Sequence, residues 1–408
     1  MTTSRSPIYL TAACCSGYLV MGLVFSLIGV GLESFAVQIG SSVARVGSLF
    51  FLFMGGATFL MLFAVGPLID RFGQRPVLMA GGLVCALSMW LLVHAESLLS
   101  ACALMFFLGA GSAGLNGGVN TLINHLHRDN PERMLNVGNL FFGVGAVLMP
   151  LTGSWLIGGA GLGALLMFAA CGCLLPVVMF AAARFPDDVG VEDFRLADAG
   201  KAVSDPLVVL FCVLIFLYVG LEASMGIWSR PVVADAWGLK APLDQLLLAG
   251  YWGSLMTGRL LAGTLFHKIP GRKLVLRCSI GAVIGLTMFA MADSLWVAAF
   301  ALWFSGLCFA PVFPTSLGSA GRVFRRYTGT IFSMIIACSV LGGVSIAGLV
   351  GSFAGAGSMR AGLFVVAGCA LAMLLIQVTI SRRVELRLGE AAAAANANST
   401  THLLERYQ

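Results

Sequence analysis

Long apolar runs, broken at short intervals by charged or turn-forming residues, fill almost the whole chain of 408 residues. A helix needs about 20 mostly apolar residues to cross the hydrocarbon core of a bilayer. Twelve runs have roughly that length, at 8–34, 44–65, 76–95, 98–124, 134–157, 160–184, 206–228, 243–266, 273–292, 295–318, 327–354 and 360–381. The pattern predicts an all-α membrane protein with 12 transmembrane helices.

The longest polar interruption of this pattern divides the spans into two sets of six. It covers 185–205, where acidic and basic side chains are frequent. We therefore expect an N-terminal six-helix bundle over 1–184, a cytoplasmic linker over 185–205 and a C-terminal six-helix bundle over 206–383. The remainder, 384–408, is rich in Ala, Asn, Ser and Thr with little apolar periodicity, and it is predicted to be a disordered cytoplasmic tail.

Short segments of the first half recur in the second. The run at 30–34 near the end of the first span resembles 219–223 in the seventh, and 66–71 after the second span resembles 263–268 after the eighth. Two pseudo-symmetric six-helix halves are typical of carriers that work by alternating access, with the binding site at the interface between the halves.

Composition and charge narrow the class of protein. Hydrophobic residues make up 59% of the chain and charged residues only 10%, which excludes an ordinary soluble enzyme. The net charge is +6, and most of the 24 Lys and Arg residues lie in the loops on the side of the two termini. The positive-inside rule therefore predicts a multi-pass protein of the cytoplasmic (inner) membrane with both termini in the cytoplasm. The partners expected are the lipid bilayer and a small-molecule solute; nucleic acid is not expected.

The 11 cysteines lie inside apolar runs, without the spacing of a zinc site, and we interpret them as small core residues. Motifs for haem, flavin or a nucleotide are missing, as is a nucleophile paired with a base. We expect no enzyme activity, no metal, no catalytic residues and no cofactor other than a coupling ion, which is a proton or, alternatively, sodium. A monomer is expected.

Three ionisable residues fall inside the predicted spans, at Glu33, Glu222 and Arg259. A charged side chain at the centre of a bilayer costs about 2.5–3.5 kcal/mol on insertion scales, so each one is a functional hypothesis. Glu33 is predicted to couple transport to a proton, unless its span ends early and the carboxylate is wetted at the mouth of the cavity. Glu222 is predicted to share a proton or to bind the solute; the alternative is a structural ion pair with Arg259.

Neutral polar residues suggest how a solute is bound. Asn116, Asn120 and Asn124 follow one another at four-residue intervals along one face of a helix. Asn139 lies in the next span, and Trp252 lies two turns before Arg259. Amides and an aromatic face suit a hydroxyl-rich solute such as a sugar. The alternatives are amide bonds that only join helices, and an aromatic ring that faces lipid.

The segment 66–75 resembles the signature of the loop between spans 2 and 3 in the major facilitator superfamily, with Gln74 in place of a basic residue. The resemblance implies that acidic and basic groups latch helix ends in the outward-open state. In the second copy His267 stands where the acid would be, so the resemblance does not imply a symmetric latch. The gating residues it assigns are Gly66, Asp70, Arg71, Gly73 and Arg75.

The chain also resembles the fucose permease-like group of fucose/glucose/galactose:cation symporters, through 31–33, 115–120, 135–145, 218–222, 258–259 and 310–315. In this comparison Glu33 replaces an aspartate that takes part in proton coupling, and Asn116 replaces a glutamate. Because Asn116 cannot ionise, coupling with one fewer carboxylate, coupling by sodium and coupling through Glu222 all stay open.

These observations predict a secondary active transporter that moves a small polar solute, most simply a sugar, by proton-coupled symport with alternating access. Two alternatives remain. The 18 Met and 28 Phe residues are compatible with a proton-antiport exporter of amphipathic metabolites or drugs. A non-transporting membrane sensor on a carrier fold would bind solute without flux.

Overall fold

The computed structural model describes residues 5–41, 43–185, 196–239, 243–355 and 359–405, and within these ranges the regular structure is helical throughout. The first half consists of α1 (Arg5–Ile39), α2 (Val43–Leu60), the π-helical segment η1 (Met61–Val65), α3 (Gly66–Phe72), α4 (Gln74–Leu92), α5 (Leu98–Leu126) and α6 (Pro131–Ala182). A short helix, α7 (Leu196–Val203), follows in the segment between the halves. The second half consists of α8 (Pro206–Trp237), α9 (Leu243–Thr264), α10 (Gly271–Ala290), α11 (Leu295–Phe309), α12 (Val312–Val323), α13 (Thr328–Gly355) and α14 (Met359–Glu405).

The helices confirm the prediction of an all-α membrane protein. Among the described residues, 11 helical segments are long and apolar enough to cross a membrane. The other predicted span is α9, which has 22 residues and whose mean hydropathy is lowered by Arg259 and by several glycines and hydroxyl residues.

Breaks inside the long helices lie at glycine and proline residues. Two predicted spans are joined in α6, which leaves helical geometry at Gly161, where φ is 80°. The span predicted at 295–318 is broken between α11 and α12, because Pro311 cannot donate the backbone hydrogen bond that would continue the helix.

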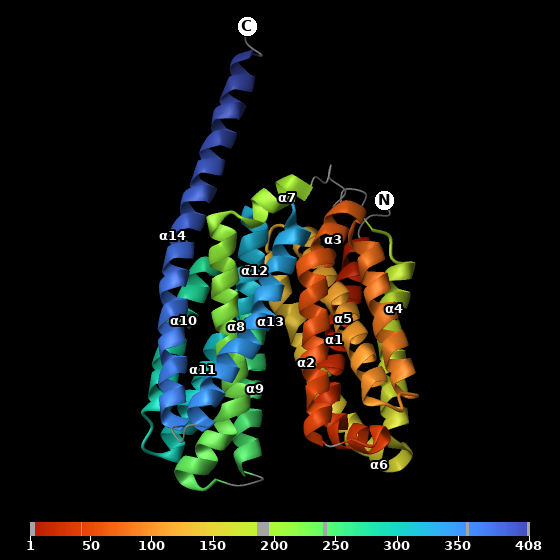
Figure 1. Ribbon diagram of the computed structural model, residues 1–408. Helices are drawn as coiled ribbons and strands as arrows, with labels where there is room; N and C mark the ends of the chain where they lie inside the picture. The colour runs from red at the N-terminus through yellow and green to blue at the C-terminus, as the bar shows by residue number, and fades with distance from the viewer. Residues whose placement is uncertain (1–4, 42, 186–195, 240–242, 356–358, 406–408) are drawn as a thin grey trace.

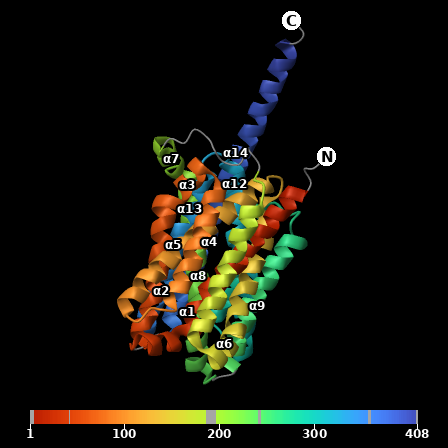
Figure 2. The same ribbon diagram turned by 90° about the vertical axis from the view of Figure 1, so that its right-hand side faces the viewer.

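Figure 1 shows two bundles side by side, α1–α6 on one side and α8–α14 on the other. The start of α1 and the last turns of α14 lie at the same end of the molecule, which we call the termini end. The bundles approach each other most closely there, and the same end is at the top in the perpendicular view of Figure 2. The hydrogen bonds between the halves, described below, belong to this end.

Glycines allow helices within a bundle to pack backbone to backbone. A Cβ atom on Gly145 of α6 would lie 1.9 Å from the carbonyl oxygen of Leu19 on α1, and one on Gly22 of α1 would lie 2.0 Å from that of Phe142. In a bilayer such close van der Waals packing replaces the hydrophobic drive that holds soluble helices together.

The tail predicted over 384–408 begins within α14, which the structure describes as a helix to Glu405 that extends beyond the bundle. Alanine has the highest helix propensity, and the tail contains a run of alanines. Two ion pairs hold the first part of this extension: Arg387 lies 2.7 Å from Asp205, and Glu385 lies 2.8 Å from Arg272.

We predict that Gly145→Val destabilises the carrier, because the new side chain would overlap the α1 backbone. Overpacking of this kind costs about 1–3 kcal/mol or more. The measurement is the thermal unfolding midpoint of the purified protein. Gly158→Ala on the same helix is the control, since a Cβ there meets nothing within 4 Å. Equal midpoints for the two variants would contradict the packing argument.

Candidate functional site

The centre of the second half contains a buried ion pair between Glu222 on α8 and Arg259 on α9. The Arg259 Nη2 and Glu222 Oε1 atoms are 3.5 Å apart, and the two side chains are 9% and 15% exposed. The Arg259 Nε atom is buried and has no hydrogen-bond partner in the described part of the chain. Because guanidinium carries five N–H donors, this pair keeps donor capacity for a further ligand. The structure thus brings together two residues that the sequence singled out, in the arrangement of the ion-pair alternative.

Tyrosines surround this pair. The Tyr251 hydroxyl donates to the backbone oxygen of Glu222 at 3.2 Å. The Tyr218 hydroxyl is buried close to Glu222 and Arg259 and makes no hydrogen bond within the described residues. Arg259 also lies near the hydroxyl of Tyr18, which belongs to α1 in the other half. Arg259 therefore lies on the side of the pair toward the first half.

The asparagine stripe forms a hydrogen-bonded chain with α1. The Tyr18 hydroxyl donates to Asn120 Oδ1 at 2.7 Å, and Asn120 Nδ2 donates to Asn116 Oδ1 at 2.7 Å. Asn120 is fully buried, whereas Asn116 is partly exposed. Asn124 instead packs against Gly321 of α12. Asn120 thus joins two helices of one half, and Asn116 at the end of the chain keeps exposed surface for a solute.

The other predicted solute residues lie apart from this chain. Asn139 Nδ2 donates to the Leu135 carbonyl of its own helix at 2.9 Å. Trp252 is 40% exposed and packs against Gly226 of α8. Neither side chain makes a hydrogen bond to the ion pair among the described residues. The backbone of Glu33 belongs to α1, but its side chain lies outside the described part of the structure.

The predicted gating motif contacts the opposite half through its acid. Asp70 accepts hydrogen bonds from the Gly329 and Thr330 amides at 2.9 and 2.8 Å and from the Thr330 hydroxyl at 2.6 Å. A carboxylate suits this position, because the first N–H groups of α13 are unpaired within the helix and carry partial positive charge. Gly66 makes room for α13, since a Cβ there would lie 2.4 Å from Thr330 Cα. Gly73, with φ at 80°, ends α3.

The arginines of the motif lie within the first half. Arg71 is exposed, and its guanidinium lies over the Phe72 ring at 5.1 Å. Arg75 donates to the carbonyl of Ala181 near the end of α6 at 3.0 Å. The structure therefore separates the motif into an acid that crosses between the halves and two bases that stay on one side.

A second contact between the halves was missed by the sequence reasoning. Glu132 at the start of α6 pairs with Arg322 of α12 at 2.7 Å, and one turn further Asn136 Nδ2 donates to the Thr315 hydroxyl at 3.0 Å. Arg133 Nε donates to the Gly263 carbonyl at 3.2 Å. An acid in the first turn of a helix is ordinary capping, so its sequence position did not indicate a partner in the other half.

At the termini end, the α5–α6 turn contacts α1 through His127. The His127 Nε2 atom lies 2.8 Å from the Thr11 hydroxyl on α1. Burial, together with the nearby Arg133 charge, lowers the pKa of His127, so the ring is neutral at pH 7. A neutral ring adds no charge to the contact between the halves.

Two helix bundles closed at one end, with buried ionisable groups where they meet, define a membrane carrier. The chain belongs to the Major Facilitator Superfamily, whose sequence profile matches residues 14–234. This confirms the predicted class and makes the protein a transporter, not an enzyme.

Relatives and a solved structure agree with that family. The chain is 25% identical over 322 residues to a glucose/galactose transporter of Brucella abortus, covering 74% of this chain and 77% of the relative. It is 26% identical over 313 residues to a putative glucose/galactose transporter of Helicobacter pylori, covering 71% and 76%. The fold is similar to that of the E. coli fucose:proton symporter FucP in the outward conformation, with a TM-score of 0.81, 16% identity and coverage of 92% and 99%.

We predict that Glu222→Gln destabilises the protein by about 3–5 kcal/mol, because it leaves the Arg259 charge buried and unpaired. The double variant Glu222→Gln/Arg259→Met should recover much of that loss in thermal unfolding. Glu96→Gln, at an exposed loop position, is the control. A double variant that is no more stable than the single one would show that the pair is not coupled.

We predict that Asp70→Asn loosens the contact with α13, because an amide accepts fewer hydrogen bonds and places its own N–H groups among donors. Each buried donor left unpaired costs about 1–3 kcal/mol. Hydrogen exchange of the amides at 328–331 should accelerate roughly tenfold or more, since about 1.4 kcal/mol corresponds to a factor of ten. Arg71→Gln should leave exchange there unchanged. Unaltered exchange in Asp70→Asn would contradict the latch.

Proposed function

We propose that the protein is a proton-coupled symporter that imports a sugar across the cytoplasmic membrane, with both termini in the cytoplasm. The observation that carries this proposal is the Glu222–Arg259 pair, which is buried and incompletely satisfied at the interface between the halves. A carboxylate that can take up a proton lies next to a donor group that can bind a hydroxyl-rich solute.

The choice of a sugar rests on the site and on the relatives. Asn116 offers a partly exposed amide from the first half, at the end of the hydrogen-bonded chain from Tyr18 through Asn120, and Tyr218 offers a buried hydroxyl without a partner within the described residues. Many neutral hydrogen bonds suit an uncharged polyol. The two relatives described above are named as glucose/galactose transporters, and the structural neighbour is a fucose:proton symporter.

The conformation fits an importer waiting for external solute. Asp70 and Glu132 join the halves at the termini end, and the positive-inside rule places that end in the cytoplasm. The site is then closed to the cytoplasm and faces outward, in line with the similarity to FucP in the outward conformation.

Proton and solute binding can be linked through the ion pair. When Glu222 is ionised, it holds Arg259 through the charge pair. A proton on Glu222 cancels its charge and releases guanidinium donors, which can then bind solute hydroxyls. Solute in turn favours the protonated carrier, because linkage between two ligands is reciprocal. Glu33 is the second proposed coupling carboxylate.

A second candidate is export of amphipathic compounds by proton antiport. Phe25 and Phe142 lie with ring centroids 5.8 Å apart, Phe25 is 43% exposed, and Met256 reaches across to Gly143. This apolar surface between the halves would suit an amphipathic substrate. The substrate panel below separates the two candidates.

The experiment that tests the proposal is uptake into proteoliposomes of labelled hexoses, deoxyhexoses and amino sugars under an inward proton gradient, with an uncoupler as control. We expect accumulation of one sugar class that collapses with the uncoupler. A parallel sodium gradient, without a proton gradient, should give no accumulation. Flat traces for every sugar would overturn the proposal and favour efflux of amphipathic compounds.

We predict that Glu33→Gln abolishes accumulation driven by protons but keeps exchange of labelled for unlabelled sugar in counterflow. Glutamine removes the titratable group while keeping the size and polarity of the side chain. Uptake and counterflow are measured on the same proteoliposomes, with Glu96→Gln as the control. Loss of both activities would assign Glu33 to solute binding instead.

A further inference from the structure

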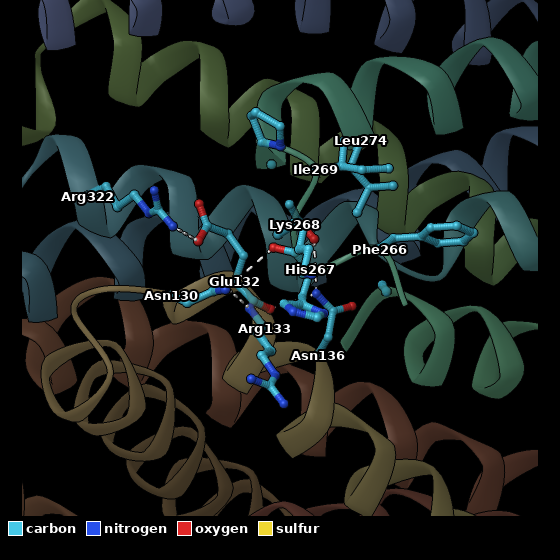
Figure 3. Close-up of a pocket in the computed structure, with 14 residues that line it drawn as sticks. Asn130, Glu132, Arg133, Asn136, Phe266, His267, Lys268, Ile269, Leu274 and Arg322 are labelled. Atoms are coloured by element: carbon cyan, nitrogen blue, oxygen red, sulfur yellow. Dashed lines mark hydrogen bonds and ion pairs between the residues drawn. The ribbon is translucent and has the colours of Figure 1, made fainter. Parts of the chain in front are cut away.

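A cavity of about 210 Å³ lies between the two halves at the termini end. Figure 3 shows its walls, which come from the start of α6, the turn between α9 and α10, the start of α10 and the helix α12. Glu222 and Arg259 do not line it. The cavity is therefore distinct from the proposed solute site, and both halves contribute to it.

The charges around this cavity favour an anion. Arg133, Lys268, Arg322 and Glu132 line it. Glu132 is paired with Arg322 at 2.7 Å, so these two charges offset each other. Within the described part of the chain, no carboxylate lies within ion-pair distance of Arg133 or Lys268. The lining has a net positive charge without a matching protein anion.

Two helix starts add to this positive field. The first turn of α6 and the first turn of α10 both line the cavity. The N-cap of α10 is Pro270, which provides no side-chain acceptor for the amides of that turn. Unpaired N–H groups at a helix start bind phosphate or carboxylate oxygens well. At α6 the Asn130 side chain already accepts from the Arg133 amide, so this property belongs to the start of α10.

A buried polar atom at the same cavity lacks a partner. Asn136 is 1% exposed, and its Nδ2 atom donates to the Glu132 carbonyl at 2.8 Å and to the Thr315 hydroxyl at 3.0 Å. The Glu132 carbonyl can only accept, which fixes the orientation of the amide. Asn136 Oδ1 then has no donor within the described residues. A hydroxyl group on a ligand would satisfy it.

We propose that this cavity binds the phosphate group of a small hydroxylated molecule, with Lys268 and Arg133 on the phosphate and Asn136 Oδ1 accepting from a hydroxyl. Its volume lies below the roughly 300–1,000 Å³ of sites for drug-sized ligands, so the ligand is a small phosphate ester or the headgroup of an anionic lipid. Because the lining comes from both halves, the bound anion holds the termini end closed. A phosphorylated product inside the cell would thereby slow further import, a consequence that rests on the proposed function; the binding itself does not.

The test is titration calorimetry of the purified full-length protein in detergent with glucose 6-phosphate, inorganic phosphate and free glucose. We expect glucose 6-phosphate to bind, inorganic phosphate to bind more weakly, and free glucose to bind independently of Lys268. Lys268→Gln should weaken glucose 6-phosphate binding at least tenfold. Lys273→Gln is the matched control, an exposed lysine of the same region that does not line the cavity. Equal binding by Lys268→Gln and the wild type would overturn the proposal.

A second arm separates the sources of phosphate. The same variants are compared in vesicles of phosphatidylglycerol and of phosphatidylcholine. Stabilisation by phosphatidylglycerol that requires Lys268, without binding of glucose 6-phosphate, assigns the phosphate to a lipid headgroup. If neither glucose 6-phosphate nor phosphatidylglycerol has any effect, the proposed site is wrong. Glucose 6-phosphate trapped inside proteoliposomes should lower sugar uptake by the wild type but not by Lys268→Gln. If the wild type transports no sugar at all, the transport proposal is contradicted, but the binding result still holds.

Discussion

Asp70 and Glu132 hold the two bundles together at the termini end, and the rest of the arrangement depends on this closure. Asp70 accepts hydrogen bonds from the otherwise unpaired N–H groups at the start of α13, and Glu132 pairs with Arg322 of α12. Both acids belong to the first half and both receive donors from the second. Such contacts are polar and can be exchanged for water, so they can close one end of a carrier without joining the halves permanently.

Because the carrier is closed at one end, the buried Glu222–Arg259 pair can bind a solute that enters from the other end. An ionisable pair at the core of a single bundle would be a costly element of structure. In this carrier Arg259, paired with Glu222, lies near Tyr18 of the opposite half, so a solute bound there could contact both halves. Binding energy from both halves can then favour their movement about the solute, which is what alternating access requires.

Much of the fold was predictable from the sequence because a bilayer allows few ways to satisfy the backbone. Apolar run length predicted the helices, whereas the break at Pro311 divides one predicted span into α11 and α12. The pairing of Glu222 with Arg259 was foreseen as an alternative, since a buried guanidinium needs a counter-charge. Contacts of Glu132 with Arg322 were not predictable, because the partners are 190 residues apart and each lies at a helix end, where charge is ordinary. The part of α14 beyond the predicted twelfth span has a run of alanines, which carries helix propensity but no apolar period.

The central claim is that a proton and a sugar cross together through the site between the halves. The most direct measurement is the external pH of a weakly buffered suspension of proteoliposomes, without an imposed gradient, when sugar is added outside. Proton symport predicts that the medium becomes alkaline as sugar enters, that the signal vanishes with an uncoupler, and that Glu33→Gln abolishes it. Acidification of the medium, or sugar entry without any pH change, would contradict the account.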